Sequence, residues 1–313
     1  MSLPAKPPYH LLVMTKRRTI LIHLACGVLA VALYAILSGP REPSYQGRSL
    51  SQWLEVWSNT DKADPTNQMV REAMDAIGAK AIPSLLAWLS CEETPLKKKV
   101  NDIAIRIGEP FGWGPMFSDN RQMCAQVGFL HLGPQGRTAI PELVRLLNNP
   151  RATQTANAAA YALACVGTEG TIPPLLSVLT NPQHPAHSLA PMRISLMGTN
   201  ALPLIPALVQ CLQETNAETA AFAATTLGYL RLEPDLVVPA LATSLRDARV
   251  RVRQSAGNAL RRFGAESRAA VPALLGARND PDPSVRELAT RALFNLDPQA
   301  LTNTLPTTNA PGP

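Results

Sequence analysis

A short apolar phrase returns along the chain at a nearly constant interval, and that interval constrains the fold more than any other feature. Each copy begins with Ile-Pro or Val-Pro and carries apolar residues at positions i, i+3, i+4 and usually i+7, which form one face of a helix. The proline is tolerated because the first turn of a helix needs no amide donor there. The copies begin at residues 82, 140, 172, 205, 238 and 271, so the last five starts are 32, 33, 33 and 33 residues apart.

A second amphipathic segment follows each phrase, after a polar residue that predicts a turn and a helix N-cap. The clearest is at the end of the array, where Val285, Leu288, Ala292 and Leu296 share one helical face. Two amphipathic helices per period, neither able to bury its face alone, predict an all-α fold. We expect an α-solenoid of about six stacked antiparallel helix pairs over residues 66–296. Most pairs end in a glycine suited to a left-handed turn, and one has Arg231 instead; the glycines are Gly133, Gly167, Gly198 and Gly264.

The phrase [VI]P-x-L-x-x-x-L followed by D-P-x-V-R, as in VPALLGARNDPDPSVRELATRAL at 271–293, resembles HEAT repeats of the short bacterial, lyase-associated type. The 33-residue period also fits ankyrin arrays and nearly fits tetratricopeptide arrays. The chain has neither the TPLH phrase of the first nor the Trp/Gly/Tyr pattern of the second. The resemblance implies a solenoid that presents an extended surface to a partner.

The resemblance also implies a ladder of aspartate–arginine pairs along the array. Earlier repeats hold Ala220 and His187 at the arginine position, so the ladder is expected to be local. Two repeats keep both residues, and the pairs expected are Asp247 with Arg253 and Asp280 with Arg286.

The N-terminus predicts a membrane anchor. Residues 1–18 are basic and are expected in the cytoplasm, and residues 19–37 (Thr19 to Leu37) carry no charge. Nineteen helical residues span roughly 28 Å, close to the hydrocarbon thickness of a bilayer. Positive charge before the segment favours a single-pass protein of the inner membrane with its repeats in the periplasm or outside the cell. A cleaved signal peptide is the alternative, although the exit has no A-x-A pattern.

Three shorter segments complete the predicted organisation. Residues 38–65 are expected to form a linker and an N-terminal capping helix, because GRSLSQWLEVW at 47–57 places Leu50, Trp53, Leu54 and Trp57 together. Residues 297–313 are of low complexity and are expected to be disordered. An insertion at 109–120 interrupts the array, since the starts at 82 and 140 lie 58 residues apart.

The insertion, EPFGWGPMFSDN, gathers Phe111, Trp113 and Phe117 in a chain that is otherwise poor in aromatic residues. Insertions in solenoids map to loops on one face, often the binding face, and aromatic residues are common interface anchors. The three side chains are therefore partner-binding candidates, and the alternative is that they fill a gap between misaligned repeats. The loop has no His or Cys to act with its acidic and hydroxyl groups, so a catalytic role is not expected.

The net charge of +6 does not indicate a nucleic-acid partner, because residues 1–40 contribute +4 of it. Within the repeats, seven arginines and two acidic residues lie between Arg246 and Arg268. Arg249 and Arg253 share a helical face, and Arg261 and Arg262 lie two turns further on. These four are candidates for contact with a partner, an anionic polymer or lipid headgroups, and a solvated rim with ladder pairs is the alternative.

No motif for catalysis, phosphate binding or zinc binding is found, so neither enzymatic activity nor a cofactor or metal is expected. The two histidines of HPAH at 184–187 and the five cysteines have no ligand clusters around them, and the thiols on apolar stripes are expected to be buried. The function predicted is a membrane-anchored scaffold for an as yet unidentified protein partner. Similar repeats occur in phycobilin lyases, so a chromophore lyase is a second hypothesis, which the exported location disfavours.

Overall fold

A computed structural model describes residues 42–59, 66–90, 121–150 and 152–296, and those from Pro43 onward belong to one compact unit. The predicted anchor at 19–37, the insertion at 109–120 and the tail at 297–313 lie outside the described residues. The description below is therefore of the capping region and the helical repeats.

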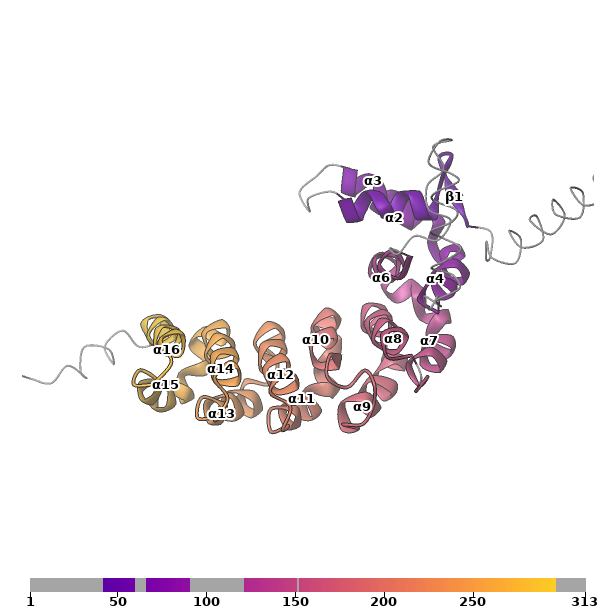
Figure 1. Cartoon of the computed structure of the whole chain (residues 1–313). Helices are drawn as coiled ribbons and strands as arrows, with labels where there is room; N and C mark the ends of the chain where they lie inside the picture. The colour runs from indigo at the N-terminus through magenta and orange to yellow at the C-terminus, as the bar shows by residue number, and fades with distance from the viewer. Residues whose placement is uncertain (1–41, 60–65, 91–120, 151, 297–313) are drawn as a thin grey trace, which may run out of the picture. The chain divides into compact units, whose positions relative to one another are not determined.

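The described repeats form six helix pairs, as the periodicity predicts (Figure 1). The first helix of each pair carries the recurring phrase, with proline in its first turn, except in α13, which begins at Pro234 and has Pro239 inside it. From α9 onward each first helix contacts the next first helix, and from α8 onward each second helix contacts the next second helix, which makes two layers. The pairs are α4 (Ile82–Leu89) with α6 (Arg121–Leu132), α7 (Ile140–Leu147) with α8 (Thr153–Val166), α9 (Ile172–Thr180) with α10 (Ala190–Ile194), α11 (Ile205–Cys211) with α12 (Ala217–Leu230), α13 (Pro234–Ser244) with α14 (Val250–Phe263), and α15 (Val271–Ala277) with α16 (Pro283–Leu296).

The core lies between the two layers. First helices contribute leucines such as Leu143, Leu175 and Leu208, all fully buried. Second helices contribute small residues that let their backbones approach closely, most of all where Gly228 of α12 meets Ala259 of α14. A Cβ at Gly228 would lie 2.5 Å from the Ala259 Cα, so α12 and α14 pack backbone to backbone at this point.

The N-terminal cap contains the expected helix, α2 (Leu50–Asn59), which packs against α3 (Thr66–Ile77). A two-stranded antiparallel hairpin, β1 (Ser44–Tyr45) and β2 (Arg48–Ser49), precedes it and was not predicted from the sequence. The hairpin turn has positive φ at both central residues, Gln46 (48°) and Gly47 (77°). The indole Nε1 of Trp53, which is 2% exposed, donates to the Tyr45 carbonyl at 3.1 Å and ties the hairpin to α2.

The helix ends confirm the glycine prediction. The four glycines predicted at helix ends all have positive φ, between 48° and 57°. Arg231 (φ 52°, ψ 39°) takes the same left-handed conformation as Gly167 (φ 55°, ψ 25°), so a residue with a Cβ holds this turn. Gly198 and Gly264 differ from both, with ψ of −132° and −134°. Short 3-10 helices then lead into the next repeats: η1 (Gly78–Ala81), η3 (Gly133–Ala139), η4 (Glu169–Thr171), η5 (Ser195–Leu204) and η6 (Gly264–Ala270).

The repeat that starts at residue 172 departs from the pattern, because its second helix α10 has only 5 residues where α8, α12, α14 and α16 have 14. Prolines at 182, 185 and 191 prevent a longer helix. Within the described part of the chain, one stretch, Ala190–Cys211, is long and apolar enough to cross a membrane. It consists of α10, η5 and α11, is interrupted at Gly198, and buries Ile194, Leu204 and Leu208 completely, so we assign it to the solenoid core.

Candidate interaction surfaces

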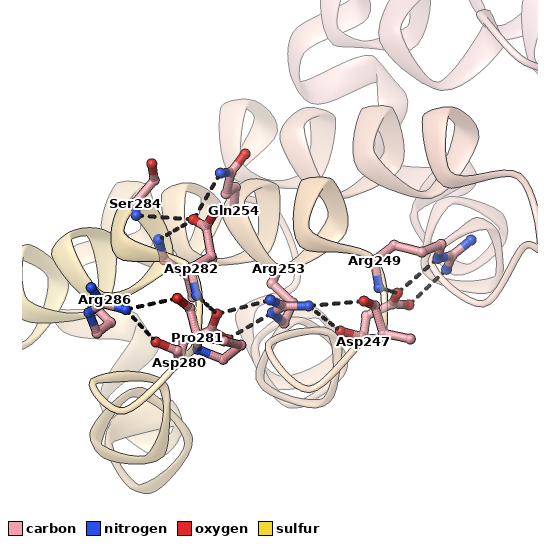
Figure 2. Close-up of polar contacts among 11 residues, drawn as sticks. Asp247, Arg249, Arg253, Gln254, Asp280, Pro281, Asp282, Ser284 and Arg286 are labelled. Atoms are coloured by element: carbon pink, nitrogen blue, oxygen red, sulfur yellow. Dashed lines mark hydrogen bonds and ion pairs between the residues drawn. The ribbon is translucent and has the colours of Figure 1, made fainter.

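A chain of arginines links successive repeats at the start of the second helices (Figure 2). Arg253 of α14 donates from Nε and Nη2 to the two carboxylate oxygens of Asp280, at 2.8 and 2.9 Å. Its Nη1 donates to the carbonyls of Asp247 and Ala248 at 2.9 and 3.1 Å. The side chains of Arg253 and Asp280 are nearly buried, at 11% and 8% exposed. Through these contacts Arg253 links the turn before α14 to the turn before α16.

The expected pairing within each repeat was wrong. Arg253 reaches Asp247 only through its carbonyl, and its ion pair is with Asp280 of the next repeat. Arg286 likewise donates to the carbonyls of Asp280 and Pro281, at 2.8 and 3.0 Å. Each of the two guanidinium groups donates to backbone carbonyls of the turn that precedes its own helix. The guanidinium of Arg253 also donates to the carboxylate of Asp280 in the next repeat.

Arg249 supplies a further link in the repeat where the arginine position holds Ala220. Its Nε and Nη2 donate to the Asp247 carboxylate at 2.8 and 2.7 Å, and its Nη1 donates to the carbonyls of Glu214 and Thr215 at 2.6 and 2.8 Å. These are the contacts that Arg253 makes one repeat later, shifted by 33 residues. The ladder is therefore longer than the sequence predicts.

Because its side chain takes part in the ladder, Arg249 does not cap the helix that follows it. The equivalent residues of the neighbouring repeats, Asn216 and Asp282, cap helices α12 and α16 by accepting hydrogen bonds from two backbone amides each. Arg249 is the N-cap residue of α14 and makes no side-chain cap. The lost cap of α14 is thus exchanged for a link between repeats.

One repeat earlier, His187 occupies the arginine position and faces Glu214. The imidazole is 5% exposed, with Nδ1 2.9 Å from the Val178 carbonyl and Nε2 3.6 Å from a Glu214 carboxylate oxygen. His184 Nδ1 accepts from the Ala186 amide at 3.1 Å. The two histidines therefore contact different backbone groups, and among the residues described no cluster of three metal-ligating side chains occurs.

The ladder shifts the pKa values of its carboxyl groups. The hydrogen bonds from Arg249 hold the pKa of Asp247 below its ordinary value. Burial raises the pKa of Asp280, but hydrogen bonds from Arg253 and from the Asp282 amide outweigh it, and the net shift is downward. Both carboxylates are therefore more acidic in the folded protein than in an unfolded chain.

The four arginines proposed as one candidate site do not form a single patch. Arg249 and Arg253 direct their guanidinium groups into the ladder at the start of α14, whereas Arg261 and Arg262 lie in its last turn. At about 1.5 Å per residue, Arg253 and Arg262 are roughly 13 Å apart along the helix. The other three candidates, Phe111, Trp113 and Phe117, lie outside the described residues.

Arginine–aromatic pairs that the sequence reasoning missed join neighbouring second helices. The guanidinium of Arg262 lies 3.8 Å from the ring centroid of Tyr229, and those of Arg251 and Arg193 lie 5.4 and 5.2 Å from the rings of Phe222 and Tyr161. In each pair the aromatic residue belongs to one second helix and the arginine to the next. Counting arginine and aromatic residues separately for first and second helices would have indicated that both gather in the second helices.

Two adjoining grooves, of about 470 and 360 Å³, run between α13 and α15. They share Arg246, Asp247 and Ala273, and small side chains form most of their walls. Their lining includes Asp247, which pairs with Arg249, and the ion pair of Arg253 with Asp280, so these grooves border the ladder.

One family model matches part of the repeat array. Residues 205–294, from α11 into α16, match the family model described as HEAT repeats. No curated protein matches the chain. Solved structures that match the chain include an engineered protein (18% identity, TM-score 0.44, covering 67% of this chain and 95% of that one) and a designed armadillo repeat protein (18%, 0.42, 69% and 100%). They also include the complex of CpcE and CpcF of phycocyanin lyase from a Nostoc species (19% identity, TM-score 0.37, 82% and 99%). Residues 205–294 are thus similar to HEAT repeats, and the helix pairs around them continue the same repeat architecture.

Proposed function

We propose that the protein is a scaffold that binds a protein partner outside the cytoplasm, held at the inner membrane by residues 19–37. The supporting observation is the continuous stack of helix pairs, whose outer faces expose large side chains such as Tyr229 (56% exposed) and Phe294 (66%). Stacked repeats of this kind present extended surfaces. The uncharged segment after Lys16, Arg17 and Arg18 supports the anchor and its orientation.

The anchor is tested with alkaline phosphatase fused after Leu296, because this enzyme is active only outside the cytoplasm. We expect activity in the membrane fraction. Changing Leu24→Arg and Leu29→Arg should abolish it, since each arginine at mid-membrane costs about 2.5–3.5 kcal/mol of insertion free energy. An inactive phosphatase fusion together with a fluorescent GFP fusion at the same point would contradict the proposed orientation.

Partner binding is tested by photo-crosslinking in intact cells. A photoreactive residue replaces Ser255 on second helix α14 in one variant and Leu176 on first helix α9, 37% exposed, in the other. We expect a discrete protein adduct, of the same mass in independent preparations, from at least one of the two positions. If neither position gives an adduct while both variants melt like the wild type, the scaffold proposal is wrong.

A further inference from the structure

The two layers of the repeat array differ sharply in composition. First helices α7, α9, α11, α13 and α15 contain no aromatic residue and have a net charge of −1. Second helices α8, α10, α12 and α14 have a net charge of +4 and four aromatic residues. Phe263 is fully buried and Arg253 belongs to the ladder, so the accessible arginine and aromatic residues among them are Tyr161, Phe222, Tyr229, Arg193, Arg251, Arg261 and Arg262. Since arginine and aromatic side chains are enriched at protein interfaces, this asymmetry identifies the second-helix layer as the interaction face.

We infer that the second-helix layer from α8 to α14 binds an extended acidic segment of a protein partner through its arginine–aromatic pairs, an inference that rests on the proposed scaffold function. The pairs Tyr161–Arg193, Phe222–Arg251 and Tyr229–Arg262 are distributed along this layer, one between α8 and α10 and two between α12 and α14. We name them the arginine–aromatic row.

The ring fixes each guanidinium and leaves donors for a carboxylate. A guanidinium that lies over an aromatic face keeps its edge N–H groups free, and that edge matches a carboxylate in two-point hydrogen bonding. The ring also restricts the side chain before the partner arrives, which lowers the entropy lost on binding. The row is therefore arranged in advance for anionic groups.

The row arginines differ from Arg249 and Arg253 in their partners. In the part of the chain that the structure describes, Arg193 and Arg262 have no ion pair, and the Nε of Arg193 is buried without a hydrogen-bond partner. Arg251 meets Glu218 at 3.5 Å, with both side chains about half exposed. Such exposed pairs contribute little to stability, so a partner's carboxylate can displace Glu218.

The spacing sets the size of the segment. The arginines of the row lie on α10 and α14. Packed helices lie about 8–10 Å apart, so the two steps from α10 to α14 span about 16–20 Å. Arg251 and Arg262 are separated by about 16 Å along α14, at about 1.5 Å per residue. A path from Arg193 past Arg251 to Arg262 is therefore roughly 32 Å long, and an extended chain, which advances about 3.3 Å per residue, covers it in about nine or ten residues. The charge and length of the row thus match a nine-residue acidic stretch, whereas a duplex nucleic acid would need more phosphate contacts than three spaced arginines provide.

The test uses the full chain in cells, with the photoreactive residue at Ser255. The variant Arg193→Gln/Arg251→Gln/Arg262→Gln removes the row's charges. The matched control Arg145→Gln/Arg268→Gln/Arg291→Gln removes the same charge from exposed arginines outside the row. Cation–π contacts at exposed sites contribute little to stability, so both variants should fold, and their melting curves check this.

We expect the adduct to fall roughly tenfold in the row variant and to change less than about twofold in the control. Mass spectrometry should place the crosslink in a partner segment with at least two net negative charges in nine residues. Equal adducts in both variants, a crosslinked segment that is neutral or basic, or an adduct sensitive to nuclease or lipid extraction would overturn the inference. Absence of every adduct, from Leu176 as well as Ser255, would instead reject the scaffold proposal.

Discussion

Arg249 makes the contacts that the repeat assigns to position 220, where the chain carries Ala220. Its guanidinium binds the Asp247 carboxylate and the carbonyls of Glu214 and Thr215, as Arg253 binds the equivalent groups one repeat later. The two side chains leave the backbone at different positions, since Arg249 precedes α14 and Arg253 lies in its first turn. A ladder can therefore persist where its sequence pattern is lost.

The exchange between Arg249 and Ala220 predicts non-additive stabilities. Arg249→Ala should lower the free energy of unfolding by about 1–2 kcal/mol, because it removes charge-assisted hydrogen bonds. Ala220→Arg should destabilise the wild type, since Arg249 already occupies the place of the incoming guanidinium. The double variant should regain at least half of the loss caused by Arg249→Ala, which urea unfolding can measure. Effects that add within about 0.5 kcal/mol would show that Arg249 is not a substitute for the missing arginine.

The ladder carboxylates predict loss of stability in acid. Asp247 and Asp280 have lower pKa values folded than unfolded, so their ionised forms favour the folded state. This stabilisation is complete above about pH 5 and is lost as the pH falls through about 4 toward the folded pKa values. Urea midpoints at several pH values should therefore drop on acidification.

The variant Asp280→Asn tests this assignment. It should be less stable at pH 7, because Arg253 loses its charged partner, and its midpoint should vary less between about pH 5 and 3 than that of the wild type. Asp235→Asn, an exposed residue in the first turn of α13, serves as the control and should keep the wild-type pH dependence. Parallel curves for wild type and Asp280→Asn would assign the acid sensitivity to other groups.

Two glycines predict opposite responses to alanine. At Gly228, a Cβ would lie 2.5 Å from Ala259 Cα, so Gly228→Ala should separate α12 from α14 and cost about 1–3 kcal/mol. At Gly276 in α15, no atom lies within 4 Å of the added Cβ, and Gly276→Ala should stabilise the protein by about 0.5–1 kcal/mol. Thermal melts of the two variants distinguish these outcomes, and a neutral Gly228→Ala would show that the layer can relax there.

The thiols of Cys165, which is partly buried, and of Cys211, which is buried, predict slow alkylation of the folded protein. Burial is the main cause that raises the pKa of each thiol to about 12, and for Cys211 the charge of Glu214 contributes to that shift. At pH 8 about one thiol in ten thousand would then be ionised, and the thiolate is the reactive form. Mass spectrometry after iodoacetamide treatment should find both unmodified in native protein and modified in urea. Rapid labelling of native Cys165 alone would indicate that the surface between α8 and α10 opens.

Much of the fold was predictable because its signals are local. Helix faces, prolines in first turns and glycines at helix ends lie within a few residues of the elements they define, and the structure confirms them over residues 66–90, 121–150 and 152–296. The short length of α10 also has a local cause, the three prolines at 182, 185 and 191, which we overlooked because the repeat pattern predicts a full-length helix there. The hairpin at Gln46 and Gly47 depended on a contact with Trp53, which no local pattern reveals.

For the candidate surface, too, the helix pairs that carry it were predictable from the sequence and the contacts between its side chains were not. The sequence by itself determined the 33-residue period, and with it the stacked helix pairs, because amphipathic periodicity is a property of neighbouring residues. Only the tertiary structure decided that Arg253 pairs with Asp280, that Arg249 replaces an arginine at Ala220, and that Arg262 lies on Tyr229. These partners are 27 to 35 residues apart, and a side chain several bonds long can reach either neighbouring repeat. Which one it reaches depends on how the repeats stack, and stacking is set by packing at the interface between helices.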